Sequence, residues 1–309
     1  MVSFERGLVA RDSCANRRAG AAGSGVRVLM FGRTGQVARE VIRRDGDVAI
    51  TALGRADVDL SEPKAAEEAV LAADVDAVLN AAAWTDVDGA EAEEAAAARI
   101  NADAPAAIAR AAAKRGLPFL HISTDYVFDG AGTTPWREGD RPAPKSAYGR
   151  TKLKGEQAVA AAAGPHVVLR TAWVFSSHGK NFVKTMLRVG AGRDRLTVVD
   201  DQVGGPTPAA AIAEACLDIL AAHHAGRGVS GVFHFAGAPA VSWRGFAEAI
   251  FEEAGMDVDV APIATEDWPT PAERPLNSRL DCAAIRAAYG IVQPDWRAGL
   301  RDVLKELKS

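Results

Sequence analysis

Residues 26–38 read VRVLMFGRTGQVA, and the pattern of the remaining chain follows from this stretch. The apolar run Val26–Phe31 has the length of a buried strand, and the turn Gly32–Ala38 has the spacing Gly-x-x-Gly-x-x-Ala before a helical pattern begins. Glycines let a pyrophosphate approach the backbone, and the N-terminus of the next helix offers N–H donors. The alternative is a tight strand-to-helix turn without a ligand. The turn predicts a dinucleotide site at Gly32, Arg33, Thr34, Gly35, Gln36 and Val37.

Short apolar strands and longer alanine-rich helices alternate downstream of this turn. Strands that alternate with helices need right-handed crossovers, which build a parallel sheet covered on both faces. The sequence therefore predicts an α/β fold with a doubly wound parallel sheet of the Rossmann type. The expected strands are 26–31, 48–53, 77–79, 119–123 and 167–170, and the expected helices are 35–44, 62–73, 90–115 with a break near Pro105, and 147–163.

The regular alternation of predicted strands and helices ends after Trp173, where Gly and Pro become frequent. This change predicts a smaller, interwoven C-terminal lobe that binds the substrate. It is interwoven because a helix at 208–222 and a strand at 232–235 resemble further parts of the sheet domain. We expect a dinucleotide-binding domain at 26–174, which 206–235 rejoins, a substrate-binding lobe at 175–205 and 236–309, and a disordered extension or a misplaced start at 1–25.

Composition excludes several classes of protein. The chain of 309 residues has 36 Lys and Arg against 40 Asp and Glu, a net charge of −4, so no general positive field recruits nucleic acid or an anionic membrane. No apolar run is long enough to predict a membrane span. Cys14, Cys216 and Cys282 are few, odd in number and widely spaced, which argues against a disulfide framework or a zinc knuckle and favours a reducing, cytoplasmic setting.

The end of the second predicted strand bears on the choice of cofactor. It reads Leu53-Gly54-Arg55, without the carboxylate that often binds the adenosine ribose at this point. An arginine there suits a 2′-phosphate and predicts NADPH. Asp57 and Asp59 follow closely and can pair with Arg55 or bind adenosine themselves, so the use of NADH stays open. The alternative for Arg55 is a solvated surface side chain.

Tyr148 and Lys152 are spaced i and i+4 on a predicted helix, which places a phenol and an ammonium on one face. A tyrosine with a pKa near 10 needs roughly 4 kcal/mol of stabilisation to ionise at neutral pH, and a neighbouring ammonium is suited to supply part of it. The pair predicts general acid catalysis. The alternative is surface decoration.

Thr124 ends the strand that begins at Phe119, so its hydroxyl is expected at the carboxyl edge of the sheet. Ligands of open α/β sheets bind at that edge, and a hydroxyl there can orient a substrate carbonyl toward the tyrosine. Taken alone, Thr124 is a helix or turn cap. Its place beside the other two motifs favours the catalytic interpretation.

Taken together, these motifs resemble the extended short-chain dehydrogenases/reductases, which act mostly on nucleotide sugars. The resemblance rests on the glycine turn, Asn80–Ala83, Ser123–Phe128 and the Tyr148/Lys152 pair. Within that family, four further segments are similar to the dTDP-4-dehydrorhamnose reductase branch, and the resemblance runs from Val26 to the C-terminal helix. The four segments are 170–174, 181–186, 201–207 and 274–280.

The resemblance implies an activity and a set of site residues. The implied activity is the NADPH-dependent reduction of the C4 ketone of dTDP-4-dehydro-β-L-rhamnose to dTDP-L-rhamnose, the last step of dTDP-rhamnose biosynthesis. The implied catalytic residues are Thr124, Tyr148 and Lys152. Asn101 matches an asparagine of the proton relay. Asn101, Tyr148 and Lys152 are also implied to contact the cofactor, and Thr124 to contact the substrate. The other implied residues are Gly32, Gly35, Gln36, Asp59, Leu60, Asn80, Ala81 and Ala82 for the cofactor, Thr85, Val87 and Trp173 for the sugar, and Asn181 and Arg274 for the diphosphate.

One position departs from the family pattern. Some members join two subunits through Mg²⁺ held by glutamates; Glu40 matches one of these, but the position aligned with another is Ala210. This departure argues against Mg²⁺ and leaves a monomer or a weak homodimer as the expected state. The spacing of the histidines predicts no metal site either.

Two alternative functions stay open from the sequence. Another nucleotide-linked 4-keto-6-deoxysugar could be the substrate, because the sequence does not read the base or the sugar. A non-catalytic NADP-binding regulatory subunit is the second alternative. The related 4,6-dehydratases carry an Asp-Glu pair after the catalytic threonine, whereas Asp125 is followed here by Tyr126, which favours simple reduction.

Overall fold

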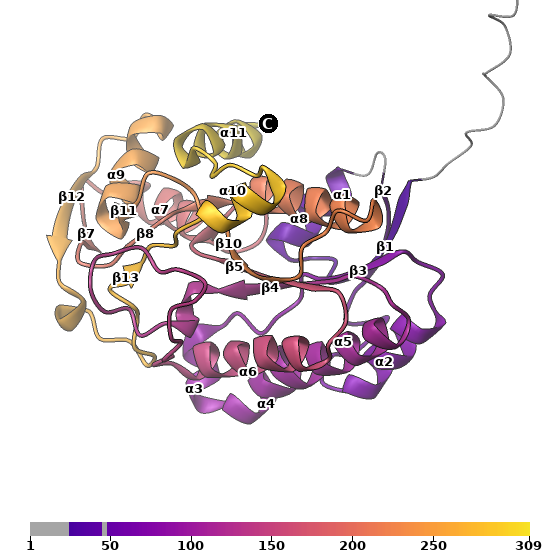
Figure 1. Ribbon diagram of the computed structural model, residues 1–309. Coiled ribbons are helices and arrows are strands. Elements are labelled where there is room, and N and C mark those ends of the chain that lie inside the picture. Colours follow the sequence, from indigo (N-terminus) through magenta and orange to yellow (C-terminus); the bar gives the residue numbers. More distant parts are fainter. Residues whose placement is uncertain (1–24, 45–47) are drawn as a thin grey trace, which may run out of the picture.

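A parallel sheet of six strands forms the centre of the protein, which a computed structural model describes for residues 25–44 and 48–309. The predicted extension lies, up to residue 24, outside the described residues. The fold is the doubly wound α/β fold that the sequence predicts (Figure 1). In spatial order the strands are β10 (Gly231–His234), β5 (His166–Thr171), β4 (Phe119–Thr124), β3 (Ala77–Asn80), β1 (Val26–Phe31) and β2 (Val48–Leu53).

The chain reverses its direction of travel across the sheet between β1 and β3. From β1 it moves to β2 at one edge, and then it returns to β3 on the other side of β1. Phe31 at the end of β1 is in register with Leu53 on one side and with Asn80 on the other. The connections leaving these strands diverge, which opens a crevice at their carboxyl ends.

Helices cover both faces of the sheet (Figure 1). Alternate residues of β1 point to opposite faces: Val28 and Met30 belong to one apolar core, and Leu29 and Phe31 to the other. The first core is closed by α1 (Gln36–Arg43), α8 (Ala209–His224) and α10 (Ala283–Tyr289), and the second by α2 (Pro63–Ala72), α5 (Ala104–Lys114) and α6 (Ala147–Ala161).

The predicted break near Pro105 takes the form of a π-helical turn that ends two residues before it, and a further interruption lies between α3 (Val87–Ala92) and α4 (Glu94–Ala98). The segment consists of α3, α4, the π-helical turn (Arg99–Asp103) and then α5, so the interruptions precede the proline. The backbone stays helical from Ala98 to Ala104, and Pro105, which has no N–H, cannot continue the regular hydrogen-bond ladder of the preceding turn.

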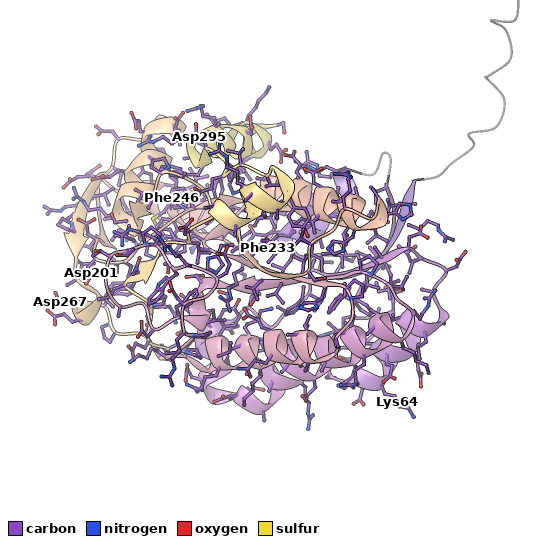
Figure 2. The ribbon with its side chains drawn as sticks, viewed as in Figure 1. Lys64, Asp201, Phe233, Phe246, Asp267 and Asp295 are labelled. Carbon is purple, nitrogen blue, oxygen red and sulfur yellow. The ribbon has the colours of Figure 1, made fainter. Side chains whose placement is uncertain are left out.

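A smaller lobe with its own apolar core lies beside the carboxyl edge of the sheet. Phe175, Phe246, Trp296 and Leu300 are buried in this core, whereas Phe233 of β10 belongs to the core of the sheet domain (Figure 2). The lobe contains α7 (Phe182–Gly190), α9 (Trp243–Ala254) and α11 (Trp296–Lys308), and the parallel pair β7 (Arg195–Val199) and β12 (Asp259–Ile263).

Short strands connect the lobe to the sheet domain. β6 pairs with β9 just after the last residues of β5, and β8 lies between β11 and β13. Their bounds are β6 (Val174–Phe175), β8 (Val203–Gly204), β9 (Thr207–Pro208), β11 (Val241–Ser242) and β13 (Asn277–Ser278). Of the helices formed by the described residues, none combines the length and apolarity needed to cross a membrane.

Candidate functional site

A cavity of about 990 Å³ lies at the carboxyl edge of the sheet, where β1 and β3 diverge. Its volume is that of a site for a small molecule or a cofactor. Most of the site residues predicted from the sequence line it. They are Gly32, Arg33, Thr34, Gly35, Gln36, Val37, Arg55, Asp59, Leu60, Ala81, Ala82, Thr85, Val87, Thr124, Tyr148, Lys152 and Trp173.

One end of the cavity has the shape that a dinucleotide pyrophosphate needs. Gly32 has φ +112°, and a Cβ there would lie 3.2 Å from the backbone of Ala81 and Ala82. Gly35 precedes α1 and provides no side-chain cap, so the first N–H groups of this helix are open to an anion. These residues fit the diphosphate of a dinucleotide.

The arginines at the adenosine end have different partners. Arg33 donates to the carbonyl oxygen of Ala52 at 2.6 Å and pairs with Asp57 at 2.9 Å. Asp57 therefore pairs with Arg33 rather than with Arg55, which is exposed on the cavity wall and forms no ion pair with any residue of 25–44 or 48–309. Its guanidinium is available to a ligand.

Thr124 and Tyr148 meet where β4 ends and α6 begins. Ser146 caps α6 by accepting a hydrogen bond from the N–H of Gly149, which fixes the first turn that carries Tyr148. Burial raises the pKa of Tyr148 to about 12, and the Thr124 hydroxyl opposes this shift in part. The phenol therefore keeps its proton at neutral pH and can donate it.

Lys152 is buried one helical turn after Tyr148. Its Nζ donates to the carbonyl oxygen of Ile122 at 2.7 Å and lies 3.2 Å from Nε2 of His121. Burial lowers the pKa of Lys152 to about 8, and the carboxylate of Glu156 opposes the shift. Lys152 thus gains and loses a proton close to neutral pH.

Asp125 is a site residue to which the sequence assigned no role in the chemistry. Its side chain is buried, lines the cavity and accepts from the Thr124 hydroxyl at 3.1 Å, while Oδ2 has no hydrogen-bond partner among the described residues. Burial raises its pKa to about 6. The signal available in the sequence was its position directly after Thr124. Tyr126 follows and packs edge-on against Tyr148, with ring centroids 5.5 Å apart.

Trp173 forms the wall of the cavity next to the smaller lobe. Its φ of +49° is unusual for a residue with a side chain, and its ring stacks on Trp243 at a centroid distance of 3.5 Å. A Cβ at Gly204 would lie 2.7 Å from the Trp173 ring, so that position requires glycine. The close packing fixes the indole that faces the cavity.

Four predicted residues do not line the cavity. Asn80 lies behind the wall, where it accepts from the N–H of Ala82. Asn101 exchanges hydrogen bonds with the backbone of Trp84 and donates to Thr151, so its side chain ties the π-helical turn to the loop after β3.

Asn181 and Arg274, the predicted diphosphate ligands, have partners within the protein. Asn181 caps α7, and its amide nitrogen donates to Gln36 and to the carbonyl oxygens of Ser176 and His178. Arg274 pairs with Asp88 at 2.7 Å. Asn181 must exchange a partner before it can bind a diphosphate, whereas the guanidinium of Arg274 keeps further N–H donors.

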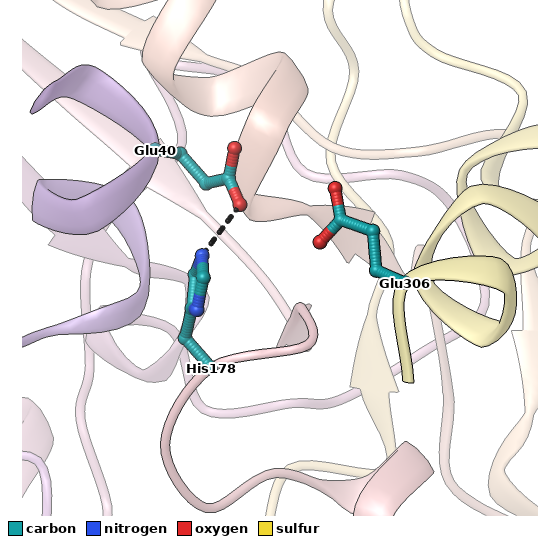
Figure 3. Close-up of side chains that lie close together, drawn as sticks. All are labelled: Glu40, His178 and Glu306. Atoms are coloured by element: carbon teal, nitrogen blue, oxygen red, sulfur yellow. Dashed lines mark ion pairs between the residues drawn. The ribbon is translucent and has the colours of Figure 1, made fainter. Parts of the chain in front are cut away.

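A cluster that the sequence did not predict brings together Glu40 of α1, His178 and Glu306 of α11 (Figure 3). Their ligand atoms lie within 4.8 Å of one another. Arg43 pairs with Glu306 at 2.8 Å and Arg44 with Glu40 at 2.6 Å, and the hydrogen bond from Arg43 is the main reason why the pKa of Glu306 is low, at about 2. Arginines already pair with both carboxylates, so a cation bound there would have to compete with these ion pairs.

Comparison with known proteins gives consistent results. The family model described as the RmlD substrate binding domain matches residues 26–309. A dTDP-4-dehydrorhamnose reductase of Sinorhizobium fredii is 41% identical over 283 residues, which cover 89% of this chain and 96% of that protein. The crystal structure of a dTDP-4-dehydrorhamnose reductase from Clostridium acetobutylicum has a TM-score of 0.86 at 36% identity, covering 92% of this chain and all of the other.

A second solved structure bears on the cofactor. It is a dTDP-4-dehydrorhamnose reductase from Bacillus anthracis in complex with NADP, with a TM-score of 0.85 at 32% identity. The two chains are covered to 91% and 99%.

Proposed function

The chain belongs to the dTDP-4-dehydrorhamnose reductase family, and we propose that it uses NADPH to reduce the C4 ketone of dTDP-4-dehydro-β-L-rhamnose. The product is dTDP-L-rhamnose, and we place the reaction in the cytoplasm. The observation that carries the proposal is a single cavity that combines the glycine turn of a dinucleotide site with Thr124, Tyr148 and Lys152.

Different residues of the cavity would bind the cofactor, orient the substrate and donate the proton. Gly32, Gly35 and the N-terminus of α1 would hold the pyrophosphate of the cofactor. When bound, the cofactor supplies the hydride. Thr124 orients the substrate carbonyl, and Tyr148 donates its proton to the C4 oxygen as that oxygen gains negative charge. Trp173 offers an apolar face to the methyl group of a 6-deoxy sugar.

The surroundings of Tyr148 favour reduction over water elimination. A dehydration needs a second acid beside the catalytic threonine, and Tyr126 fills the position after Asp125. Burial raises the pKa of Tyr126 far above its ordinary value, so this residue stays a neutral phenol and does not replace a carboxyl group. Asp125 is left as the one carboxyl group of the Thr124–Tyr126 segment.

A panel of nucleotide-linked 4-keto-6-deoxysugars tests the proposed substrate. We expect the dTDP-linked sugar to be turned over fastest with NADPH, and the proton couplings at C4 of the product to be those of rhamnose. Faster turnover of a GDP- or UDP-linked sugar would move the enzyme to another deoxysugar while leaving the mechanism intact. NADPH binding without oxidation of the nicotinamide would instead indicate a regulatory subunit.

Arg55→Ala is expected to weaken NADPH binding by about 10- to 100-fold, because a charge-assisted hydrogen bond to the 2′-phosphate contributes roughly 1.5–3 kcal/mol. NADH lacks that phosphate, so its kcat/KM is expected to change little, and we propose that it is accepted at lower efficiency. Initial rates with both cofactors measure the effect, and Arg227→Ala removes another exposed arginine as a control. Equal kcat/KM for the two cofactors, unchanged in Arg55→Ala, contradicts this assignment.

We also propose that the protein acts without Mg²⁺, as a monomer or a weak homodimer. The pairing of Glu40 and Glu306 with Arg44 and Arg43 supports this view. In addition, Ala210 offers no carboxylate at the aligned position.

A further inference from the structure

A chain of buried polar groups runs behind Lys152, on the side away from the cavity. It starts at the backbone N–H of Ala82, passes through the side chains of Asn80 and His121, and ends at Nζ of Lys152. Asn80 and His121 are fully buried, and Lys152 is 1% exposed. Since Asn80 and His121 are closed to water, each donor between them has to face an acceptor.

The backbone fixes the orientation of the Asn80 amide. Its Oδ1 accepts from the N–H of Ala82 at 3.1 Å, so the NH₂ group points to Nδ1 of His121, also at 3.1 Å. Turning the amide around would set its NH₂ group against the N–H of Ala82, with two donors in contact. The backbone N–H of Ala82 can only donate. Its hydrogen bond to Oδ1 therefore fixes which end of the Asn80 amide carries the nitrogen.

The amide in turn fixes the tautomer of His121. Nδ1 receives a hydrogen from Asn80 and so carries none of its own. Burial lowers the pKa of His121 well below its ordinary value, and the ring is neutral. A neutral imidazole with a bare Nδ1 has its proton on Nε2, and this atom lies 3.2 Å from Nζ of Lys152.

The form of Lys152 that fits this arrangement is the uncharged amine. An ammonium has three N–H donors and no lone pair, so it cannot accept from Nε2 of His121, whereas an amine can. Nζ still has hydrogens for the carbonyl oxygen of Ile122 at 2.7 Å. We propose that His121 is a positioning residue, which Asn80 holds in the tautomer that donates to Lys152 and thereby favours the uncharged form of Lys152.

Other charged groups around Lys152 act in the opposite direction or are neutralised. On α6, the carboxylate of Glu156 favours the ammonium, but Arg170 of β5 binds that carboxylate at 2.9 and 2.7 Å. Tyr148, the other titratable group on this face, stays protonated. Glu91 and Glu94, from the helices packed beside α6, lie near Arg150 instead. Among the described residues, the His121 ring is thus the polar group that opposes the charge on Lys152.

The consequence for turnover rests on the proposed function. After Tyr148 gives its proton to the substrate, its phenolate takes one from the ammonium of Lys152, and the resulting amine is protonated again from water. A donor whose pKa lies near the working pH can perform both transfers. His121 would thus adjust the pH range over which Lys152 restores the proton of Tyr148.

Nitrogen-15 NMR of the free protein tests the tautomer without substrate or cofactor. We expect two-bond correlations to show His121 with hydrogen on Nε2 and a bare Nδ1 throughout the range from pH 6 to 9. Hydrogen on Nδ1, or a charged ring in that range, overturns the proposal. The proposed function does not enter this measurement, so the two can fail separately.

A double-mutant cycle tests the effect on Lys152. Asn80→Asp replaces the donor to Nδ1 by an acceptor, which moves the ring proton to Nδ1 and lets Nε2 accept from the ammonium. We expect the Nζ titration of Lys152 to rise by at least one pKa unit, a tenfold change in proton affinity, and the alkaline limb of the kcat profile to move with it. His166→Phe removes a histidine of β5 that does not contact Lys152, and it is expected to shift neither.

The His121→Phe background separates the hydrogen-bond effect from the added charge. There, Asn80→Asp has no ring to reorient, and its negative charge alone raises the Lys152 titration by a smaller amount. If the shift is the same in both backgrounds, the ring does not transmit the effect and the proposal is wrong.

Discussion

Tyr148→Phe is expected to lower kcat by about 10²- to 10⁴-fold, the usual contribution of a general acid. The phenol keeps its proton at neutral pH because burial raises its pKa to about 12, so the wild-type residue is ready to donate. NADPH affinity is expected to stay close to that of the wild type, since the glycine turn and Arg55 hold the cofactor elsewhere in the cavity. Steady-state rates and a fluorescence titration with NADPH measure the two effects.

The chain offers a matched control for this substitution. Tyr289 is the tyrosine remote from the site, and its hydroxyl donates to the carbonyl oxygen of Val229. Tyr289→Phe removes the same atom and is expected to leave kcat unchanged. If Tyr148→Phe retains more than about half of the wild-type kcat, Tyr148 is not the proton donor.

Glu156→Leu is expected to lower the free energy of unfolding by about 3–5 kcal/mol, the usual cost of leaving a buried charge without its partner. Glu156 and Arg170 are each only 4% exposed in their side chains. The carboxylate accepts two hydrogen bonds from Arg170 and one from the Ser123 hydroxyl at 2.5 Å. Urea unfolding followed by circular dichroism measures the loss.

An exposed ion pair of similar geometry provides the control. Glu94 and Arg150 also form two hydrogen bonds, at 3.1 and 2.7 Å, but their side chains are 37% and 39% exposed. Glu94→Leu is expected to cost about 0–1 kcal/mol, because water replaces the lost partner. A similar loss in both variants would show that burial does not determine the cost. Glu156→Leu with Arg170→Met is expected to recover most of the stability.

The sheet domain could be predicted because its signals are local. A strand buried on both faces is a short apolar run, so the bounds of β1 and β2 agree with the prediction and those of β3 and β4 differ by one residue. The irregularity before α5 could be predicted because Pro105 has no N–H to donate to the preceding turn. The sequence contained no equivalent marker for the interruption between α3 and α4 at Glu93.

Only the part of the candidate site that is formed by local sequence motifs could be predicted. Gly32, Thr124, Tyr148 and Lys152 follow strands or share a helix face, so local patterns place them at one edge of the sheet. The contact of Asn80 with His121 joins residues 41 positions apart on neighbouring strands, and no periodicity in the sequence predicts it.

Long-range contacts also explain why Arg274 and Asn181, which the sequence predicted as diphosphate ligands, have partners within the protein. The pairing of Arg274 with Asp88 spans 186 positions. The hydrogen bond from Asn181 to Gln36 spans 145. Such contacts depend on how the lobe packs against the sheet domain, which no local pattern encodes.

One edge of β5 stays unpaired until late in the synthesis of the chain. β5 pairs with β4 on one side, and its other side stays open until β10 arrives from residues 231–234. During synthesis, residues 175–230, which include all of α8, leave the ribosome before that edge is covered. An open edge of apolar strand is a template for aggregation. A fragment that ends after β6 is therefore expected to precipitate, and a nascent chain of that length is a natural client for a chaperone.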